Sequence, residues 1–335
     1  MYMHSKPVHN FIVYTAFLFA IPAGSHNLLG FDDTANPVSR VSSAVHKTTS
    51  AFVIDPKNTS IVYAATSLGL FKSTDGGAHW SPSALTAGLN ALAVDPSNRS
   101  VMYAATSGKG VFKSVDAGAT WTESGLPKME VKAVLVESGS TIFAGVFDGG
   151  LQKSVDSGTN WSDAALGEKF VNALASDTSK PSVVYAGGGG GILKSIDGGA
   201  TWSKTSLAAP LVRTVSIKPR DPDTLYVGVA GGGIYRSTDG GQNWKACNPQ
   251  QQIYVVNDLL ATDSAVYAAT GIGVLKSSDG GDNWTPANNG LPTNTDIRTI
   301  AVDPSNPSVL YVGTFGAGTF KTTNGGAKWE LMESL

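Results

Sequence analysis

The chain has 335 residues, which is enough for one large all-β domain or two ordinary domains. Charged residues make up only 15% of it and the formal net charge is −2, so the whole-chain charge gives no sign of nucleic acid or another polyanion as a partner. The single cysteine, Cys247, excludes an internal disulfide, and no spacing of Cys and His resembles a metal site. We expect no metal and no cofactor.

The first 25 residues predict a secretory signal peptide. Residues 11–23 read FIVYTAFLFAIPA, an apolar run too short to cross roughly 30 Å of hydrocarbon comfortably. Ala23, Gly24 and Ser25 supply the small residues that a signal peptidase requires, so we expect cleavage near Ser25. The alternatives are an uncleaved anchor and a wrongly assigned start.

Cleavage would leave a mature protein with no stable membrane span. We expect it to be exported, in the periplasm or outside the cell. Residues 26–49 are small and polar, and are expected to form a linker or a lead-in segment before the first repeat.

One nine-residue phrase dominates the rest of the chain. Residues 72–80 read KSTDGGAHW, and closely similar phrases follow six more times at spacings of 40 to 45 residues. Each of the seven tryptophans ends one copy of the phrase. The Asp position of the successive copies holds Asp75, Asp116, Asp156, Asp197, Asp239, Asp279 and Asn324. Repetition at this period is typical of propellers.

Each repeat carries four short strand patterns. In the second repeat the four segments are NALAVDP (90–96), VMYAAT (101–106), VFKSVD (111–116) and TWTES (120–124). Gly, Pro, Asn and Ser separate these runs, and no segment after residue 30 has a helical period. Seven such units predict an all-β fold, a seven-bladed β-propeller of four-stranded blades over residues 50–335.

Two forms of ring closure are compatible with this pattern. Each repeat can supply one whole blade, so that closure depends on packing blade seven against blade one. Alternatively, residues 36–49 add a strand to the last blade. The last repeat ends with a complete pattern, KWELME (328–333), as the first arrangement requires, and the sequence leaves the choice between the two open.

The repeated phrase is placed at the turn from the third to the fourth strand of each blade. Its Asp is expected to accept hydrogen bonds from backbone N–H groups two residues on, and the preceding Ser or Thr to add a further local bond. The glycines supply a positive φ, and the Trp offers an apolar face to pack between blades. Asn324 keeps the acceptor oxygen without the charge, which favours a structural role over catalysis.

The motif S-x-D-x-G-x-x-W resembles the Asp-box, also called the bacterial neuraminidase repeat (BNR). Its seven copies span about 85% of the chain. The repeats are similar to those of the photosystem II assembly and stability factor family, which are single seven-bladed propellers, and to those of the two-propeller xyloglucanases and the sortilin-type receptors. Sialidases share the motif but have six blades. In these families the Asp-box is structural and lies away from the active face, so the resemblance implies a fold and leaves function open.

Candidate binding residues lie where each first strand begins. This position is polar in every repeat and is expected to form a collar at the channel rim, with Lys128 and Lys169 nearby. The residues that form the collar are Ser50, Asn90, Lys132, Asn172, Arg213, Asn257 and Arg298. We expect this collar to bind a ligand or a partner, because loops on that face of a propeller surround the channel. The alternative is that strand starts are simply polar and solvated.

Two other patterns favour structure. A cation precedes every repeated turn, and its aliphatic stem is expected to cover a neighbour while its charge reaches water. These cations are Lys72, Lys113, Lys153, Lys194, Arg236, Lys276 and Lys321. The glycine run 187–191 lacks the Lys-Ser/Thr ending and the helix of a phosphate loop, so a close backbone approach or an open pocket floor is the preferred interpretation.

Glycoside hydrolysis is the enzymatic alternative. It requires two carboxylates about 5–9.5 Å apart, and no feature selects a pair. A sialidase would also need three arginines at one site, for which only Arg213, Arg298 and Arg40 remain. Xyloglucanases set their catalytic aspartates between two propellers, and this chain has one. The acidic candidates in the loops of the collar side are Glu123, Glu130, Asp148, Asp163, Glu168, Asp258 and Asp296.

We therefore expect an exported, non-catalytic propeller that binds a protein partner or a membrane complex, as resemblance to the photosystem II assembly factors implies. The alternatives are a BNR-type glycoside hydrolase and a carbohydrate-binding propeller. A carbohydrate binder would need exposed aromatic rings, for which Tyr254, Phe170 and Phe315 are the candidates. We expect no nucleic-acid partner.

Overall fold

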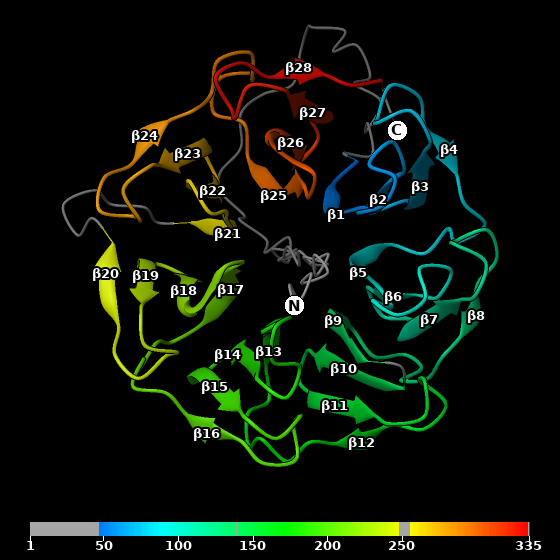
Figure 1. Ribbon diagram of the computed structural model, residues 1–335. Helices are drawn as coiled ribbons and strands as arrows, with labels where there is room; N and C mark the ends of the chain where they lie inside the picture. Colours follow the sequence, from blue (N-terminus) through cyan, green and yellow to red (C-terminus); the bar gives the residue numbers. More distant parts are fainter. Residues whose placement is uncertain (1–46, 139, 248–254, 334) are drawn as a thin grey trace, which may run out of the picture.

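The computed structural model describes residues 47–138, 140–247, 255–333 and 335. The predicted signal peptide and all but the last three residues of the predicted lead-in segment lie outside this range. The described residues form seven four-stranded antiparallel sheets, arranged as blades around a central axis (Figure 1). The predicted all-β, seven-bladed propeller is therefore confirmed. Within the described part of the chain, no helix is long and apolar enough to cross a membrane.

The strand nearest the axis is the first of each blade. These strands are β1 (Thr49–Ile54), β5 (Leu89–Val94), β9 (Val131–Ser138), β13 (Val171–Ser176), β17 (Val212–Lys218), β21 (Val256–Ala261) and β25 (Ile297–Asp303). The second strands are β2 (Val62–Thr66), β6 (Met102–Thr106), β10 (Thr141–Val146), β14 (Val184–Gly188), β18 (Asp221–Val229), β22 (Val266–Thr270) and β26 (Asn306–Thr314). Strands β1, β5 and β21 are buried at every position, because neighbouring blades cover both faces of their sheets.

The two outer strands are shorter. The third strands are β3 (Gly69–Ser73), β7 (Val111–Ser114), β11 (Gly150–Ser154), β15 (Gly191–Ser195), β19 (Gly233–Ser237), β23 (Gly273–Ser277) and β27 (Thr319–Thr322). The fourth strands are β4 (Ser81–Pro82), β8 (Thr122–Glu123), β12 (Ser162–Asp163), β16 (Ser203–Lys204), β20 (Lys245–Cys247), β24 (Thr285–Pro286) and β28 (Glu330–Leu331). Very short edge strands limit the pairing of a blade with other chains.

The repeated turn joins the third and fourth strands, as predicted. In blade 6 the hydroxyl of Ser277 donates to Asp279 Oδ1 at 2.7 Å and accepts the Gly281 N–H at 2.8 Å. Asp279 Oδ1 accepts the Asn283 N–H at 2.9 Å. The predicted acceptor was therefore wrong in one detail. The N–H group two residues after Asp donates to the serine hydroxyl, and the N–H group four residues after Asp donates to the Asp carboxylate. These bonds lower the pKa of Asp279 to about 2.

The last copy of the turn tests whether the charge matters. Asn324 Oδ1 accepts the Lys328 N–H at 2.9 Å and the Thr322 hydroxyl at 2.8 Å, the same pattern that Asp makes elsewhere. An amide oxygen is thus sufficient for the turn. This geometry agrees with the structural role predicted for the motif.

The two residues after Asp have different steric requirements. The first has a positive φ in every copy but is Ala117 in blade 2 and Ser157 in blade 3. The second is Gly in all seven copies. At Gly281 an added Cβ would lie 2.9 Å from Cys247 Sγ of the preceding blade. The contact with the preceding blade therefore requires the second glycine, in addition to its backbone conformation.

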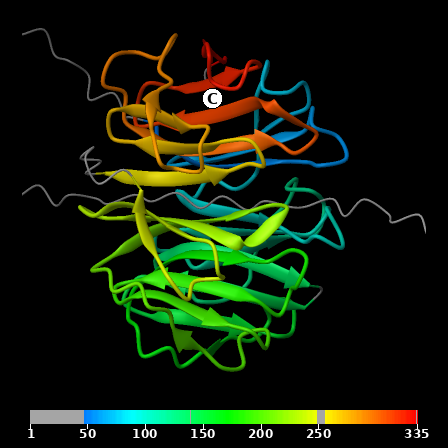
Figure 2. The same ribbon diagram turned by 60° about the vertical axis from the view of Figure 1, so that its left-hand side comes forward.

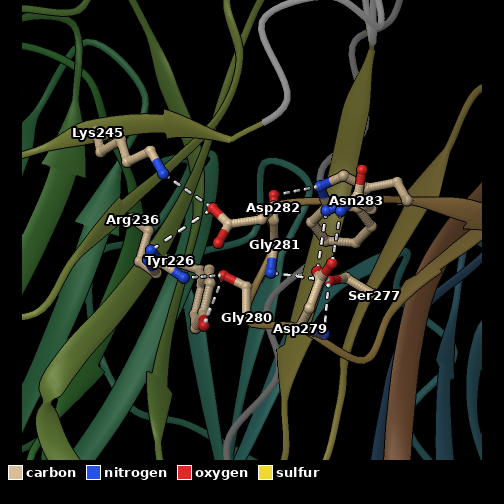
Figure 3. Close-up of polar contacts among 10 residues, drawn as sticks. Tyr226, Arg236, Lys245, Ser277, Asp279, Gly280, Gly281, Asp282 and Asn283 are labelled. Carbon is tan, nitrogen blue, oxygen red and sulfur yellow. Dashed lines mark hydrogen bonds and ion pairs between the residues drawn. The ribbon is translucent and has the colours of Figure 1, made fainter.

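Each blade is joined to the next by a cation and an aromatic ring that meet at one backbone carbonyl. In Figure 3, Arg236 and Tyr226 of blade 5 both point at Gly280 of the blade 6 turn. Arg236 Nη1 donates to the Gly280 carbonyl at 2.6 Å and Tyr226 Oη donates to it at 3.2 Å. We call this arrangement the interblade clamp.

The clamp occurs at all seven interfaces. The cation donates to the carbonyl oxygens of Ala117, Ser157, Gly198, Gly240, Gly280, Gly325 and Gly76, in blade order. A tyrosine hydroxyl shares the acceptor at every interface except that of blade 3, where Phe143 takes the ring position. The prediction that these cations are structural fits this geometry. Their charged ends were expected to be in water, however, and they donate hydrogen bonds to the next blade.

The same clamp closes the ring. Strands β25–β28 lie beside β1–β4 (Figures 1 and 2), and β25 packs on β1. Tyr311 Oη and Lys321 Nζ of blade 7 donate to the Gly76 carbonyl of blade 1 at 3.2 and 2.8 Å. Phe52 packs against the Tyr311 ring with a centroid separation of 5.9 Å. In the part of the chain that the structure describes, each blade takes its four strands from one repeat, and Thr48 adds only an isolated bridge to Phe315 of blade 7.

Replacing Tyr311 by Phe tests the clamp at the closing interface. The ring keeps its packing, but the hydrogen bond to Gly76 is lost, so we expect the free energy of unfolding to fall by about 0.5–1.5 kcal/mol. Tyr185→Phe, at the interface of blades 4 and 5, is the matched control and should cost the same amount. Urea unfolding of both variants measures these changes. An unchanged stability for both would show that the shared carbonyl contributes nothing.

Candidate binding face

The loops divide the disc into two faces. On one face, which we call the collar face, the turn after each second strand bonds to the segment that enters the blade. The Phe147 N–H donates to the Glu130 carbonyl and the Phe315 N–H to the Asp296 carbonyl, both at 2.9 Å. On the opposite face, which we call the turn face, the repeated turns bond to the loops between first and second strands, as the Gly198 N–H does to Ser182 at 2.9 Å. The predicted division of loops between the faces is what the structure shows.

Every collar residue is the extra residue of a β-bulge. The register between first and second strand shifts at this position in all seven blades, so the collar residue has no partner across the ladder. A bulge re-aims a side chain and increases local twist. The polar collar thus has a geometric origin that strand propensities do not reveal.

The three collar asparagines are buried and link neighbouring blades. Asn90 Nδ2 donates to the Val131 carbonyl at 2.8 Å. Asn172 and Asn257 donate in the same way to the first residue of the next inner strand, at 3.3 and 2.8 Å. Ser50 is also buried. The three asparagines hold blades together, a role that the sequence did not indicate.

Two of the three collar cations lie close to an acidic and an aromatic side chain. Lys132 forms an ion pair with Glu130 and lies 5.5 Å from the centroid of Phe147. Arg298 pairs with Asp296 at 2.6 Å and lies 4.9 Å from the centroid of Phe315. Cation–aromatic pairs of this kind contribute about 0.5–2 kcal/mol. They hold charged and apolar groups together at the channel mouth.

Arg213 lies within electrostatic range of the same group. Burial lowers its pKa, the charge of Arg298 adds to that effect, and Asp296 opposes it. Arg213 and Arg298 belong to blades 5 and 7, on either side of blade 6. The structure therefore brings two of the three predicted cations into one arc, while Lys132 belongs to blade 3. Lys128 and Lys169, expected nearby, are exposed in the entry loops of blades 3 and 4.

Large apolar side chains are exposed on the collar face. They occur in the loops after second strands and in the entry segments, and they are Leu68, Met129, Phe147, Val255, Ile272 and Phe315. Phe147 is 43% exposed and stacks obliquely on Phe170 with centroids 5.0 Å apart. Of the aromatic candidates for sugar binding, Phe170 and Phe315 are thus placed on this face, and Tyr254 lies outside the described residues. Aromatic residues, Met and Arg are the residue types enriched in protein–protein contacts.

The residue that follows each bulge is of a different type in blades 1 to 4 and in blades 5 to 7. In blades 1 to 4 it is alanine, and in blades 5, 6 and 7 it is Thr214, Asp258 and Thr299. Asp258 is 1% exposed and accepts four hydrogen bonds. Burial raises its pKa to about 7, although these four bonds oppose the rise. The sequence carried a usable signal here, since aligning the repeats reveals one acid among four alanines.

The acidic residues considered for glycoside hydrolysis do not share one environment. Glu123 and Asp163 lie in the outermost strands β8 and β12, away from the channel. Asp258 is buried inside β21 and was wrongly placed in a loop. Glu130, Glu168 and Asp296 are each ion-paired, with Lys132, Lys204 and Arg298 respectively. Among the described residues, no group of three or more His, Cys, Asp or Glu is placed to hold a metal ion.

The glycine run 187–191 brings two backbones together. A Cβ at Gly188 would lie 1.9 Å from the carbonyl oxygen of Phe170 in the entry segment of the same blade. The run occupies the end of β14, a two-residue turn and the start of β15. The close backbone approach expected from the sequence is therefore what the run provides.

Comparison with known proteins supports the propeller class. A family model described as the DUF6242 beta propeller domain matches residues 215–334, about a third of the chain. No curated protein matches. An ancestral GH74 enzyme superposes on 84% of this chain with a TM-score of 0.69 and 17% identity, but the match covers only 46% of that enzyme. This chain thus spans less than half of that enzyme's length.

Two structures of YCF48 match over nearly their whole length. YCF48 from Cyanidioschyzon merolae matches 83% of this chain and 95% of its own, with a TM-score of 0.64 and 14% identity. A structure of YCF48 bound to D1 peptide matches 84% and 96%, with a TM-score of 0.62 and 18% identity. The expected resemblance to photosystem II assembly factors and to BNR-type glycoside hydrolases is confirmed at the level of the fold.

The raised pKa of Asp258 predicts a specific pH dependence of stability. Because its pKa is higher in the folded chain than the usual 3.8, the folded state binds the proton more tightly. The stabilisation is complete below about pH 4 and is lost as the pH rises through about 7. In urea unfolding, Asp258→Asn should reduce the stability difference between pH 5 and pH 8 by on the order of 1–3 kcal/mol. An identical difference in both proteins would contradict this.

Proposed function

We propose that this chain is an exported, non-catalytic propeller that binds a protein partner through its collar face and serves as an assembly factor for a membrane complex. The observation that carries the proposal is the pairing of exposed Phe147 and Phe315 with Lys132 and Arg298 at the channel mouth. Aromatic residues next to cations, surrounded by further exposed apolar side chains, have the composition of interaction hot spots.

The similar structures support a single-propeller binding protein. The YCF48 structure with D1 peptide shows that a propeller of this fold and size binds a peptide. Its chain is matched over 96% of its length, whereas the GH74 enzyme is matched over less than half. Export and a membrane complex as the partner are parts of the proposal. The N-terminal sequence supports export, and the likeness to YCF48 supports a role in assembly.

Glycoside hydrolysis and simple carbohydrate binding are less well supported. The GH74 likeness concerns the fold at 17% identity. Of the seven acidic residues considered, two lie in outer strands, one is buried, three are ion-paired, and Asp148 is exposed in the turn between β10 and β11. Phe147 and Phe170 offer one aromatic platform, which suits an apolar side chain of a partner as well as a sugar ring.

Arginine variants on the two faces test the location of the site. Peptides selected by phage display on the wild-type protein provide defined probes, and their affinities are measured by fluorescence anisotropy. Arg213→Ala with Arg298→Ala should weaken binding about tenfold or more, since removing charged partners costs at least 1.4 kcal/mol. Arg220→Ala is the matched control, because Arg220 lies in a turn-face loop with its side chain 85% exposed. It should bind normally.

A second variant pair keeps the test independent of charge. Phe147→Ala with Phe315→Ala removes the two aromatic anchors and should weaken the same peptides to a similar extent. Circular dichroism and melting temperature establish that each variant is folded. Normal peptide binding by both double variants would overturn the proposed site. Hydrolysis of a glycoside panel at enzyme-like rates would overturn the non-catalytic function.

A further inference from the structure

One carboxylate joins three consecutive blades beneath the collar. Thr214 Oγ1 of blade 5 donates to Asp258 Oδ1 at 3.1 Å, and Thr299 Oγ1 of blade 7 donates to Oδ2 at 3.1 Å. The Ile300 N–H of blade 7 donates to Oδ2 at 3.1 Å, and the Leu259 N–H of blade 6 to Oδ1 at 2.9 Å. Each oxygen thus serves one neighbouring blade. We call Thr214, Asp258 and Thr299 the three-blade brace.

The brace is not required by the propeller fold. The equivalent position is Ala51, Ala91, Ala133 and Ala173 in blades 1 to 4, all of them buried. Those blades pack without a carboxylate, and burying one has a cost in free energy. All three members of the brace occur in consecutive blades, where the geometry lets them meet. The brace therefore marks the arc of blades 5 to 7 as different from the rest of the ring.

The members of the brace directly follow the collar residues of the same arc. Arg213 precedes Thr214, Asn257 precedes Asp258, and Arg298 precedes Thr299, each pair spanning a β-bulge. Because the bulge residue has no ladder partner, it is held by the paired residues on either side of it, and the brace residue is one of these two. Asn257 adds to the arc by donating to Asp296 Oδ1 at 2.8 Å, the carboxylate that pairs with Arg298.

We propose that Asp258 is a positioning residue of the collar site: through Thr214 and Thr299 it sets the placement of Arg213 and Arg298 toward an anionic group of the partner. This inference rests on the proposed function, and it adds the chemistry of the group that is recognised. Two guanidinium groups held on either side of one blade suit a carboxylate, from an acidic side chain or a chain terminus.

The ionisation of Asp258 makes the brace sensitive to pH. All four bonds come from donors, so they favour the carboxylate, while burial favours the acid and raises the pKa to about 7. The charged groups that face this region are Arg213 on β17, Arg298 on β25 and Asp296 just before β25. Protonation of Asp258 near neutral pH removes one hydrogen-bond acceptor site from the brace. The side chains of Arg213 and Arg298 should therefore be less ordered below about pH 7.

The mobility of the arginine side chains, measured without a binding partner, tests directly whether Asp258 positions Arg213 and Arg298. The chain has only six arginines, so their Nε–Hε signals in ¹⁵N NMR spectra can be assigned with single Arg→Lys variants. The triple variant Thr214→Ala, Asp258→Ala, Thr299→Ala gives blades 5 to 7 the alanine found in blades 1 to 4, so the fold should persist. We expect the order parameters of Arg213 and Arg298 to fall, while those of Arg220 stay unchanged.

Conservative variants separate positioning from general destabilisation. Thr214→Ser with Thr299→Ser keeps both hydroxyl donors and should retain the wild-type order of the arginines. In the wild type their signals should shift with pH around 7, and Asp258→Asn should abolish that shift. Unchanged arginine order in the triple variant, or a pH response that survives in Asp258→Asn, would overturn the assignment. If the triple variant does not fold, the serine variant and Asp258→Asn decide the matter.

Binding of the phage-selected peptides then distinguishes this inference from the proposed function. The triple variant should weaken peptides that depend on Arg213 and Arg298 about tenfold, and wild-type affinity should fall between pH 8 and pH 6. If the arginine double variant loses binding but the triple variant keeps it, positioning by Asp258 is wrong and the collar site stands. If neither variant loses binding, the proposed function fails.

Discussion

The propeller depends on one repeated polar contact, a cation that donates to the first carbonyl after Asp (or Asn324) in the next blade's turn, joined by a tyrosine hydroxyl at every interface but that of blade 3. Hydrophobic packing between blades is extensive but does not by itself fix their relative rotation, because it is not directional. A carbonyl that accepts two donors does fix it. The turn must therefore present that carbonyl in one orientation, which explains why Ser, Asp and Gly recur in a strict spacing.

Closure of the ring follows from the same contact. Blade 7 uses Tyr311 and Lys321 on Gly76 as every other blade except blade 3 uses its tyrosine and cation on the following turn. Among the described residues, each blade is built from one repeat and no strand is exchanged across the closing interface. Thr48 forms an isolated bridge with Phe315 there, as Glu130 does with Ser107 between blades 2 and 3.

The candidate site arises where the repeats differ. The fold needs a bulge at the start of each inner strand and tolerates asparagine or serine there, as blades 1, 2, 4 and 6 show. Blades 3, 5 and 7 place Lys132, Arg213 and Arg298 at that position, and blades 5 to 7 add a buried carboxylate beneath it. A repeating scaffold thus carries a local departure, and departures from a repeat are where binding chemistry can be added without changing the framework.

Much of the fold could be predicted because it is written seven times. The number of copies of the phrase predicted the number of blades. Asn324 in the last copy indicated that hydrogen bonds hold the turn. The cations before the turns were recognised as structural, but the sequence could not show which carbonyl they reach, because that atom belongs to the next repeat. The same limitation hid the interblade bonds of Asn90, Asn172 and Asn257.

By itself, the sequence determined the local elements: strand length, turn chemistry and the order of strands within a blade, all of which depend on residues close together in the chain. Only the tertiary structure decided which residues of different blades meet. Thr214 and Thr299 lie 44 and 41 residues from Asp258 in the chain, yet both donate hydrogen bonds to its carboxylate. Contacts between repeats depend on how neighbouring blades are rotated against each other, and a single repeat does not specify that rotation.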